Sequence, residues 1–97
     1  WGSAKATRWA VVAKDYRILL MLGDNLGDFT DSYKGSPAER QAVYEANADK
    51  WGREWIALPN PGYGSWESAP FGHDYSLPED ERVQMKRDQL QPWPERP

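Results

Sequence analysis

A short apolar segment constrains the fold more strongly than any other feature of this sequence. Residues 17–22 read Arg-Ile-Leu-Leu-Met-Leu, and Gly23 ends the run. A strand that is covered on both faces carries apolar residues without alternation, as in a parallel sheet. A second segment of this kind, Glu-Trp-Ile-Ala-Leu at 54–58, ends at Pro59. The sequence therefore predicts two buried strands that lie parallel in one sheet.

Helical patterns precede, separate and follow the two strands. The first helix is expected to begin near Ser3, an N-cap residue. Its apolar face consists of Trp9, Val12, Ala13 and Tyr16. The second begins at the capping box Ser-Pro-Ala-Glu (36–39) and runs to Gly52, and the third begins at Ser-Leu-Pro-Glu (76–79) and ends at Pro92. This order of elements predicts an α/β fold in which helical crossovers connect parallel strands.

The length allows one domain at most, because the chain has 97 residues. Two parallel strands alone rarely make a stable sheet, and the strand at 17–22 has only one partner in this chain. We therefore expect an unpaired edge on this strand and a further part of the sheet that comes from elsewhere. The first residue, Trp1, fits an internal start, and residues 92–97 are expected to form a tail.

Composition excludes several classes of function. Lys and Arg number 12 against 15 Asp and Glu, a net charge of −3, which argues against nucleic acid as a partner. The chain has no cysteine and one histidine, so disulfides, thiol catalysis and multi-histidine metal sites are excluded. No apolar run reaches the roughly 20 residues that a membrane-spanning helix needs.

The segment after the first strand, Gly-Asp-Asn-Leu-Gly-Asp-Phe at 23–29, is the strongest candidate for a functional site. Open α/β sheets bind their ligands at the carboxyl ends of the strands. Three acids gather here, Asp24, Asp28 and Asp31. No basic residue lies between 18 and 33, so the carboxylates would repel one another, and a hard divalent cation would relieve that repulsion. A solvated turn in which Asp24 and Asn25 cap backbone groups is an equally favoured interpretation.

Two further candidates lie outside this segment. Lys5 falls in the first turn of the first helix, where free N–H groups favour an anion, although the residues alone favour a surface lysine. Tyr63 lies between two glycines in a loop, where its ring would stack on a planar base or sugar. Alternatively, the loop aromatics Trp66 and Phe71 simply pack onto the core. His73 has no evident partner and is interpreted as solvated.

Four blocks of sequence resemble one known family. They are Ser-Ala-Lys-Ala-Thr-Arg (3–8), Gly-Asp-Asn-Leu-Gly-Asp-Phe (23–29), Leu-Pro-Asn (58–60) and Tyr-Gly-Ser-Trp-Glu (63–67). Their order and spacing resemble the class C acid phosphatases of the haloacid dehalogenase (HAD) superfamily, which include the lipoprotein e type of bacterial 5′-nucleotidase. The resemblance runs from about residue 3 to residue 93. It implies the C-terminal part of a HAD-type, Rossmann-like domain over residues 1–97.

The resemblance also implies a mechanism and roles for individual residues. In this family an aspartate attacks a phosphate monoester, the resulting aspartyl-phosphate is hydrolysed, and Mg²⁺ neutralises charge. Lys5 matches the catalytic lysine that steadies the phosphate and the nucleophile. Asp24 matches an aspartate that binds Mg²⁺, and Asp28 matches its partner, which holds the metal or its waters. Tyr63 matches an aromatic residue that stacks on the ring of the substrate, which the resemblance suggests is a nucleotide.

The sequence departs from the family pattern at the first motif, because no two aspartates here are two residues apart. The nucleophile and general acid are therefore expected in a missing N-terminal part of the same domain, and the 97 residues alone are predicted to be inactive. The alternative is a truncated, non-catalytic relative that acts as a binding or assembly module. Relatives are exported, so the resemblance implies a periplasmic, outer-membrane-anchored or secreted protein. It is also compatible with a homo-oligomer.

Overall fold

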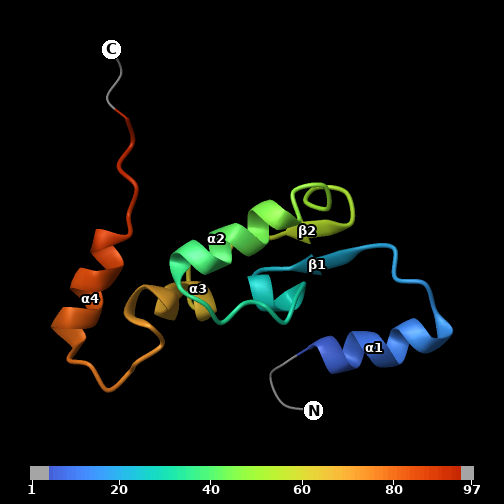
Figure 1. Ribbon diagram of the computed structural model, residues 1–97, viewed down its shortest axis with the longest axis horizontal. Coiled ribbons are helices and arrows are strands. Elements are labelled where there is room, and N and C mark those ends of the chain that lie inside the picture. The colour runs from blue at the N-terminus through green and yellow to red at the C-terminus, as the bar shows by residue number, and fades with distance from the viewer. Residues whose placement is uncertain (1–4, 95–97) are drawn as a thin grey trace.

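The computed structural model describes residues 5–94, with a small parallel sheet between helices (Figure 1). The elements in chain order are α1 (Ala6–Asp15), β1 (Met21–Gly23), the 3-10 helix η1 (Leu26–Asp28), α2 (Pro37–Ala46), β2 (Trp55–Ala57), α3 (Ser65–Ser68), the 3-10 helix η2 (Ala69–Phe71) and α4 (Glu79–Asp88). Figure 1 shows α1 and α4 at opposite ends of the molecule, with the sheet and α2 between them. The predicted α/β class is confirmed.

The sheet has two parallel strands, as predicted. Met21 lies opposite Trp55, and Gly23 opposite Ala57. Both strands are shorter than the apolar segments that predicted them, but a bond from Leu58 N to Gly23 O, at 2.7 Å, extends the pairing by one step. Within residues 5–94, β1 pairs with β2 alone, so its other edge is unpaired. This edge agrees with the expectation drawn from the sequence.

The prediction that the first strand is covered on both faces is wrong for the described part of the chain. Leu20 is 49% exposed and Leu22 is 59% exposed. Ile18 and Leu19, which precede the strand, are exposed as well. The reason is that no described element lies over these side chains, since α1 contributes no buried residue to the packing. An apolar strand is left half-covered.

The helices begin close to where the sequence placed them. Ser36 caps α2 as predicted, because its Oγ accepts a hydrogen bond from Glu39 N at 3.2 Å. However, α2 ends at Ala46 and not at Gly52, since turns at 47–50 bring the chain round toward β2. Gly52 then adopts a φ of 81°, which a glycine tolerates at no steric cost.

Two predicted termini fall partly outside the described residues. The expected N-cap Ser3 lies there, and α1 begins at Ala6 with Lys5 as its N-cap residue. The predicted tail at 92–97 is irregular over residues 92–94, and its last three residues are not described.

Much of the core consists of aromatic side chains, which form two clusters. Phe29 is buried, with its ring centroid 5.0 Å from that of Trp51 and 5.5 Å from that of Trp55. A second cluster pairs Phe71 with Tyr75 at 5.2 Å. Aromatic pairs at such distances add stability beyond the area they bury. Because Phe29 directly follows η1, the first cluster anchors the loop that leaves β1.

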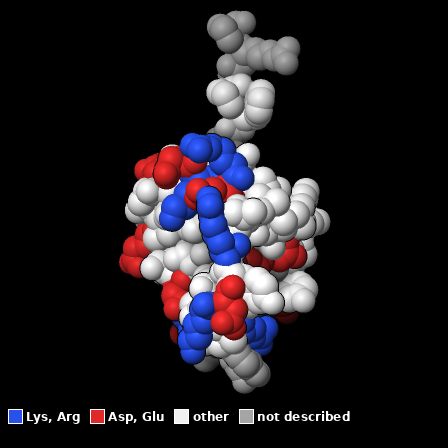
Figure 2. Space-filling view, turned by 90° about the vertical axis from the view of Figure 1, so that its right-hand side faces the viewer, with Lys and Arg blue, Asp and Glu red and all other residues white. Residues whose placement is uncertain are grey.

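The described helices and the side of the molecule that Figure 2 shows bear on membrane and nucleic-acid partners. None of the helices among residues 5–94 has the length and apolar character needed to cross a bilayer. On the α1 side of the molecule, acidic and basic side chains are interspersed between large uncharged areas (Figure 2). This mixture fits the small net charge of −3.

Candidate active site

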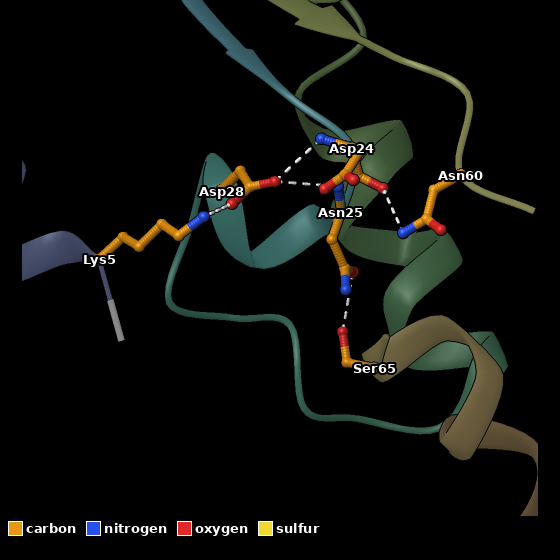
Figure 3. Close-up of polar contacts among 6 residues, drawn as sticks. All are labelled: Lys5, Asp24, Asn25, Asp28, Asn60 and Ser65. Atoms are coloured by element: carbon orange, nitrogen blue, oxygen red, sulfur yellow. Dashed lines mark hydrogen bonds and ion pairs between the residues drawn. The ribbon is translucent and has the colours of Figure 1, made fainter. Parts of the chain in front are cut away.

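The loop at the carboxyl end of β1 is held in shape by one carboxylate. Asp28 Oδ2 accepts hydrogen bonds from the backbone N–H groups of Asp24 at 2.9 Å and of Asn25 at 3.0 Å (Figure 3). Gly23 lets this carboxylate approach, because a Cβ at that position would lie 2.3 Å from Asp28 Cβ. Of the two capping residues that the sequence offered, Asn25 is the N-cap residue of η1, whereas the carboxylate that caps the backbone N–H groups of the loop belongs to Asp28 and not to Asp24.

Lys5 reaches the same carboxylate from the opposite side. Its Nζ donates to Asp28 Oδ1, across 23 residues of sequence, and forms an ion pair. Figure 3 shows the lysine side chain extending from the start of α1 toward η1. The Asp28 side chain is only 10% exposed, whereas that of Lys5 is 45% exposed. Lys5 is thus directed toward the acidic loop and is not simply a surface lysine.

The surroundings of Asp28 keep it ionised. Partial burial alone would raise the pKa of its carboxyl group, but the bonds from Lys5 and from the N–H groups of Asp24 and Asn25 stabilise the charged form. The net effect is a pKa below the ordinary value of 3.8. One negative charge is therefore fixed at the centre of the loop.

The Asp24 carboxylate, in contrast, makes no hydrogen bond or ion pair with any residue of the described range 5–94. Its backbone carbonyl accepts a bond from Asn60 Nδ2 at 3.3 Å. Asp31 lies apart, exposed, in the loop that follows η1. Within the same described range, no three His, Cys, Asp or Glu side chains gather to form a complete metal cage. A cation here would keep several waters or ligand oxygens.

Asn60 joins this loop to the loop that carries Tyr63. Its amide donates to Tyr63 O at 2.8 Å, and its Oδ1 accepts from Gly62 N at 3.1 Å and from Tyr63 N at 3.3 Å. The same side chain therefore organises the turn after β2 and bonds to Asp24 (Figure 3). Sequence reasoning gave Asn60 no role, although an asparagine between two prolines after a strand indicates such a turn.

Tyr63 itself projects into solvent and is 83% exposed. The alternative interpretation of the loop, in which its aromatics pack onto the core, holds for Phe71, which is buried, but not for the exposed Trp66. The interpretation of His73 as solvated is wrong. Its Nδ1 lies 2.6 Å from Ser68 Oγ, and its Nε2 lies 2.8 Å from the carbonyl of Lys34. His73 thus connects two loops.

Arg40 is a further residue that sequence reasoning missed. From α2 it donates to the carbonyl of Tyr33, to Ser65 Oγ at 2.8 Å and to Asn25 Oδ1 at 3.3 Å. Its partners lie 7, 25 and 15 residues away. No local pattern could have indicated these contacts.

Two hollows flank the acidic loop. The larger is a groove of about 820 Å³ that Asp24, Arg40 and Trp66 help to line. The smaller, of about 310 Å³, lies between α1 and β1, with Lys5 and Asp28 among its lining residues and apolar side chains such as Leu20 along it. The acidic loop is therefore open to ligands or to other protein segments on both sides.

These features define a class of protein: an α/β domain with an acidic loop at the carboxyl edge of a parallel sheet and a lysine directed toward that loop. The sequence model of the HAD superfamily, subfamily IIIB (acid phosphatase), matches residues 2–66. The chain belongs to this family.

Solved structures agree. The class C acid phosphatase from Bacillus anthracis is 30% identical to this chain, with a TM-score of 0.82, and the match covers 94% of this chain and 39% of that one. A structure of a class C acid phosphatase from Bacillus anthracis with tungstate bound gives 29% identity, a TM-score of 0.83 and coverage of 95% and 39%. The chain thus spans about two fifths of the length of these phosphatases.

Proposed function

We propose that this chain supplies the metal-binding and phosphate-binding part of an acid phosphatase that hydrolyses phosphate monoesters, with nucleotides as the substrate class. One observation carries the proposal. The ammonium group of Lys5 meets the carboxylate that shapes the Asp24 loop, at the carboxyl edge of the sheet. A cation and a free carboxylate placed together suit a phosphate and its counter-ion.

The donor groups fit Mg²⁺. This ion usually takes one or two protein carboxylates and fills its other positions with waters and phosphate oxygens. Asp24 offers a carboxylate with no competing partner among the described residues, so it would bind the ion directly. Asp28 already accepts three bonds and would hold the ion or its waters while keeping the loop in shape. When bound, Mg²⁺ supplies positive charge that neutralises the phosphate.

The chain's own residues would then bind and orient the substrate. Lys5 would donate hydrogen bonds to a phosphate oxygen and hold the attacking carboxylate close to it. That carboxylate and the general acid would come from the missing N-terminal part of the domain. The carboxylate oxygen bonds to phosphorus as the ester P–O bond breaks, and the leaving alcohol takes a proton from the general acid. Water then attacks phosphorus and gives a proton back to the same general acid. The P–O bond to the carboxylate breaks, which releases phosphate and restores the carboxylate.

The experiment that tests the proposal is phosphate release by the complete product of the gene. We expect turnover of phosphate monoesters that stops when a chelator removes divalent cations and returns with Mg²⁺. Residues 1–97 purified alone should give no turnover. A complete protein that lacks any phosphatase activity would favour the alternative, a non-catalytic binding or assembly module.

Replacement of Tyr63 by alanine should weaken the binding of nucleotide substrates selectively. The ring is exposed beside the site, and base–aromatic stacking contributes about 1–3 kcal/mol, so KM for a nucleoside monophosphate should rise about tenfold or more. Glycerol phosphate, which has no ring to stack, should be hydrolysed as before. Equal losses on both substrates would contradict the stacking role. Tyr75→Ala is the control, because Tyr75 is also exposed but packs on Phe71, away from the acidic loop.

The exposed apolar side of β1 is where we expect the missing N-terminal part of the domain to pack. Replacement of Leu20 by aspartate should therefore lower the free energy of unfolding of the complete protein by at least about 2 kcal/mol, since a covered leucine contributes about that much. Leu90→Asp is the control, because Leu90 is 73% exposed beyond α4. This substitution should lower the free energy of unfolding much less. Urea unfolding measures both. If both substitutions lower the free energy of unfolding by the same small amount, no other part of the protein covers the exposed side of β1.

A further inference from the structure

The guanidinium group of Arg40 connects three segments of the chain that meet beside the acidic loop. It donates to Tyr33 O in the loop before α2, to Ser65 Oγ at the start of α3 and to Asn25 Oδ1 in the acidic loop. Ser65 Oγ also donates to Asn25 Oδ1 at 2.9 Å, which closes the network (Figure 3). Two loops and one helix therefore share a single hydrogen-bonded centre.

The two side chains that Arg40 binds, Asn25 and Ser65, are neighbours of the proposed ligand-binding groups. Asn25 follows Asp24, and Ser65 lies two residues after Tyr63. The intervening Gly64 has a φ of 145°, and a Cβ there would lie 2.3 Å from Asn25 Nδ2. The backbone of the Tyr63 loop thus lies directly against the Asn25 side chain.

Arg40 is suited to fixing these loops, but not to binding phosphate. A guanidinium keeps its charge throughout the physiological range, and its planar fork is pre-organised for several acceptors at once. Both terminal nitrogens are already engaged by protein oxygens, and the side chain is half-buried. A charged donor bound to a neutral amide oxygen makes a stronger bond than a neutral donor would.

We propose that Arg40 is a positioning residue that fixes the Asp24–Asn25 loop against the Tyr63–Ser65 loop, so that one side chain sets the spacing between the cation site and the substrate ring. This inference rests on the proposed function, since it assigns Asp24 to the cation and Tyr63 to the ring. The consequence is that loss of Arg40 should weaken binding at both loops together, although Arg40 touches neither ligand.

The test compares three variants of the complete gene product. Arg40→Met removes the hydrogen-bond donors and keeps much of the length of the side chain. Arg40→Lys keeps the positive charge but lacks the planar guanidinium group. Arg87→Met is the matched control, because Arg87 is an exposed arginine of α4. Methionine and arginine have similar helix propensities, so neither helix should weaken on that account. The readouts are Mg²⁺ affinity by calorimetry, KM and kcat, and NMR signals of the Asn25 side-chain amide and the Ser65 backbone amide.

We expect Arg40→Met to weaken Mg²⁺ binding and to raise KM for a nucleoside monophosphate, each by about tenfold, as the loss of one charged hydrogen bond would. The Asn25 and Ser65 NMR signals should move together. Arg40→Lys should recover part of each effect, and Arg87→Met should show none. A folded Arg40→Met protein with unchanged Mg²⁺ affinity, KM and NMR signals would overturn the inference.

Two further outcomes remain decisive. If Arg40→Met does not fold, Ser65→Ala tests the same network. It should shift the Asn25 amide signal and raise KM several-fold, and no change would count against the inference. If the wild-type protein binds no Mg²⁺ and releases no phosphate, the proposed function fails. The joint movement of the Asn25 and Ser65 signals in Arg40→Met would still support the connection between the loops, and independent signals would refute it.

Discussion

Asp24→Asn should lower kcat/KM for Mg²⁺-dependent phosphate release by the complete protein about 10²–10³-fold or more. This is the range seen when a group that stabilises transition-state charge is lost. The physical reason is that the Asp24 carboxylate has no partner among the described residues, so its negative charge is available to a cation. An amide keeps the shape but not the charge. Calorimetry should show Mg²⁺ binding weakened at least in proportion.

Asp31→Asn is the matched control for this prediction. It removes the same charge from the same acidic stretch, but Asp31 is exposed in the loop after η1. A general effect of net charge would lower activity in both variants, whereas a direct ligand role affects Asp24 alone. Full activity in Asp24→Asn, with Mg²⁺ affinity unchanged, would show that Asp24 is not a ligand of the proposed cation site.

The parts of this site that the sequence could predict are those encoded by neighbouring residues. The capping box at 36–39 locates the start of α2, and the change from an apolar run to Gly23 locates the acidic loop at the end of a strand. Such signals are local, because capping and strand termination depend on residues within a few positions. Residue type and spacing were also enough to indicate the family.

The parts that could not be predicted depend on contacts between distant residues. Lys5 and Asp28 are 23 positions apart, and only the tertiary arrangement, which places the start of α1 near η1, brings them together (Figure 3). Arg40 sits on a helix whose own pattern gives no reason to expect Asn25 as a partner. The burial expected for residues 17–22 was wrong for a related reason: an apolar run shows that a strand is suited to being covered, but not which segment covers it.

Asp28→Asn should lower the free energy of unfolding by about 2 kcal/mol at neutral pH, whereas Lys5→Met should cost less than about 1 kcal/mol. The Asp28 carboxylate is nearly buried and accepts two backbone N–H bonds, and bonds to a charged group contribute about 1.5–3 kcal/mol. The Lys5 end of the ion pair is 45% exposed, where water screens the attraction and leaves about 0–1 kcal/mol. Urea unfolding of the two variants measures the difference.

The pH dependence gives the same prediction a second readout. Because the pKa of Asp28 is lowered in the folded state, its contribution to stability is complete above its ordinary pKa of 3.8 and is lost as the pH falls through the lower folded value. The wild-type protein should therefore lose stability in that acidic window, and Asp28→Asn should lose less. Because the bond from Lys5 is the largest of the interactions that lower this pKa, Lys5→Met should keep only the part of the window that the backbone bonds of Asp28 provide. It should also lose most of the activity, because Lys5 is the proposed phosphate-binding lysine. Equal stability losses in both variants would mean that the ion pair, and not the backbone bonds, holds the loop.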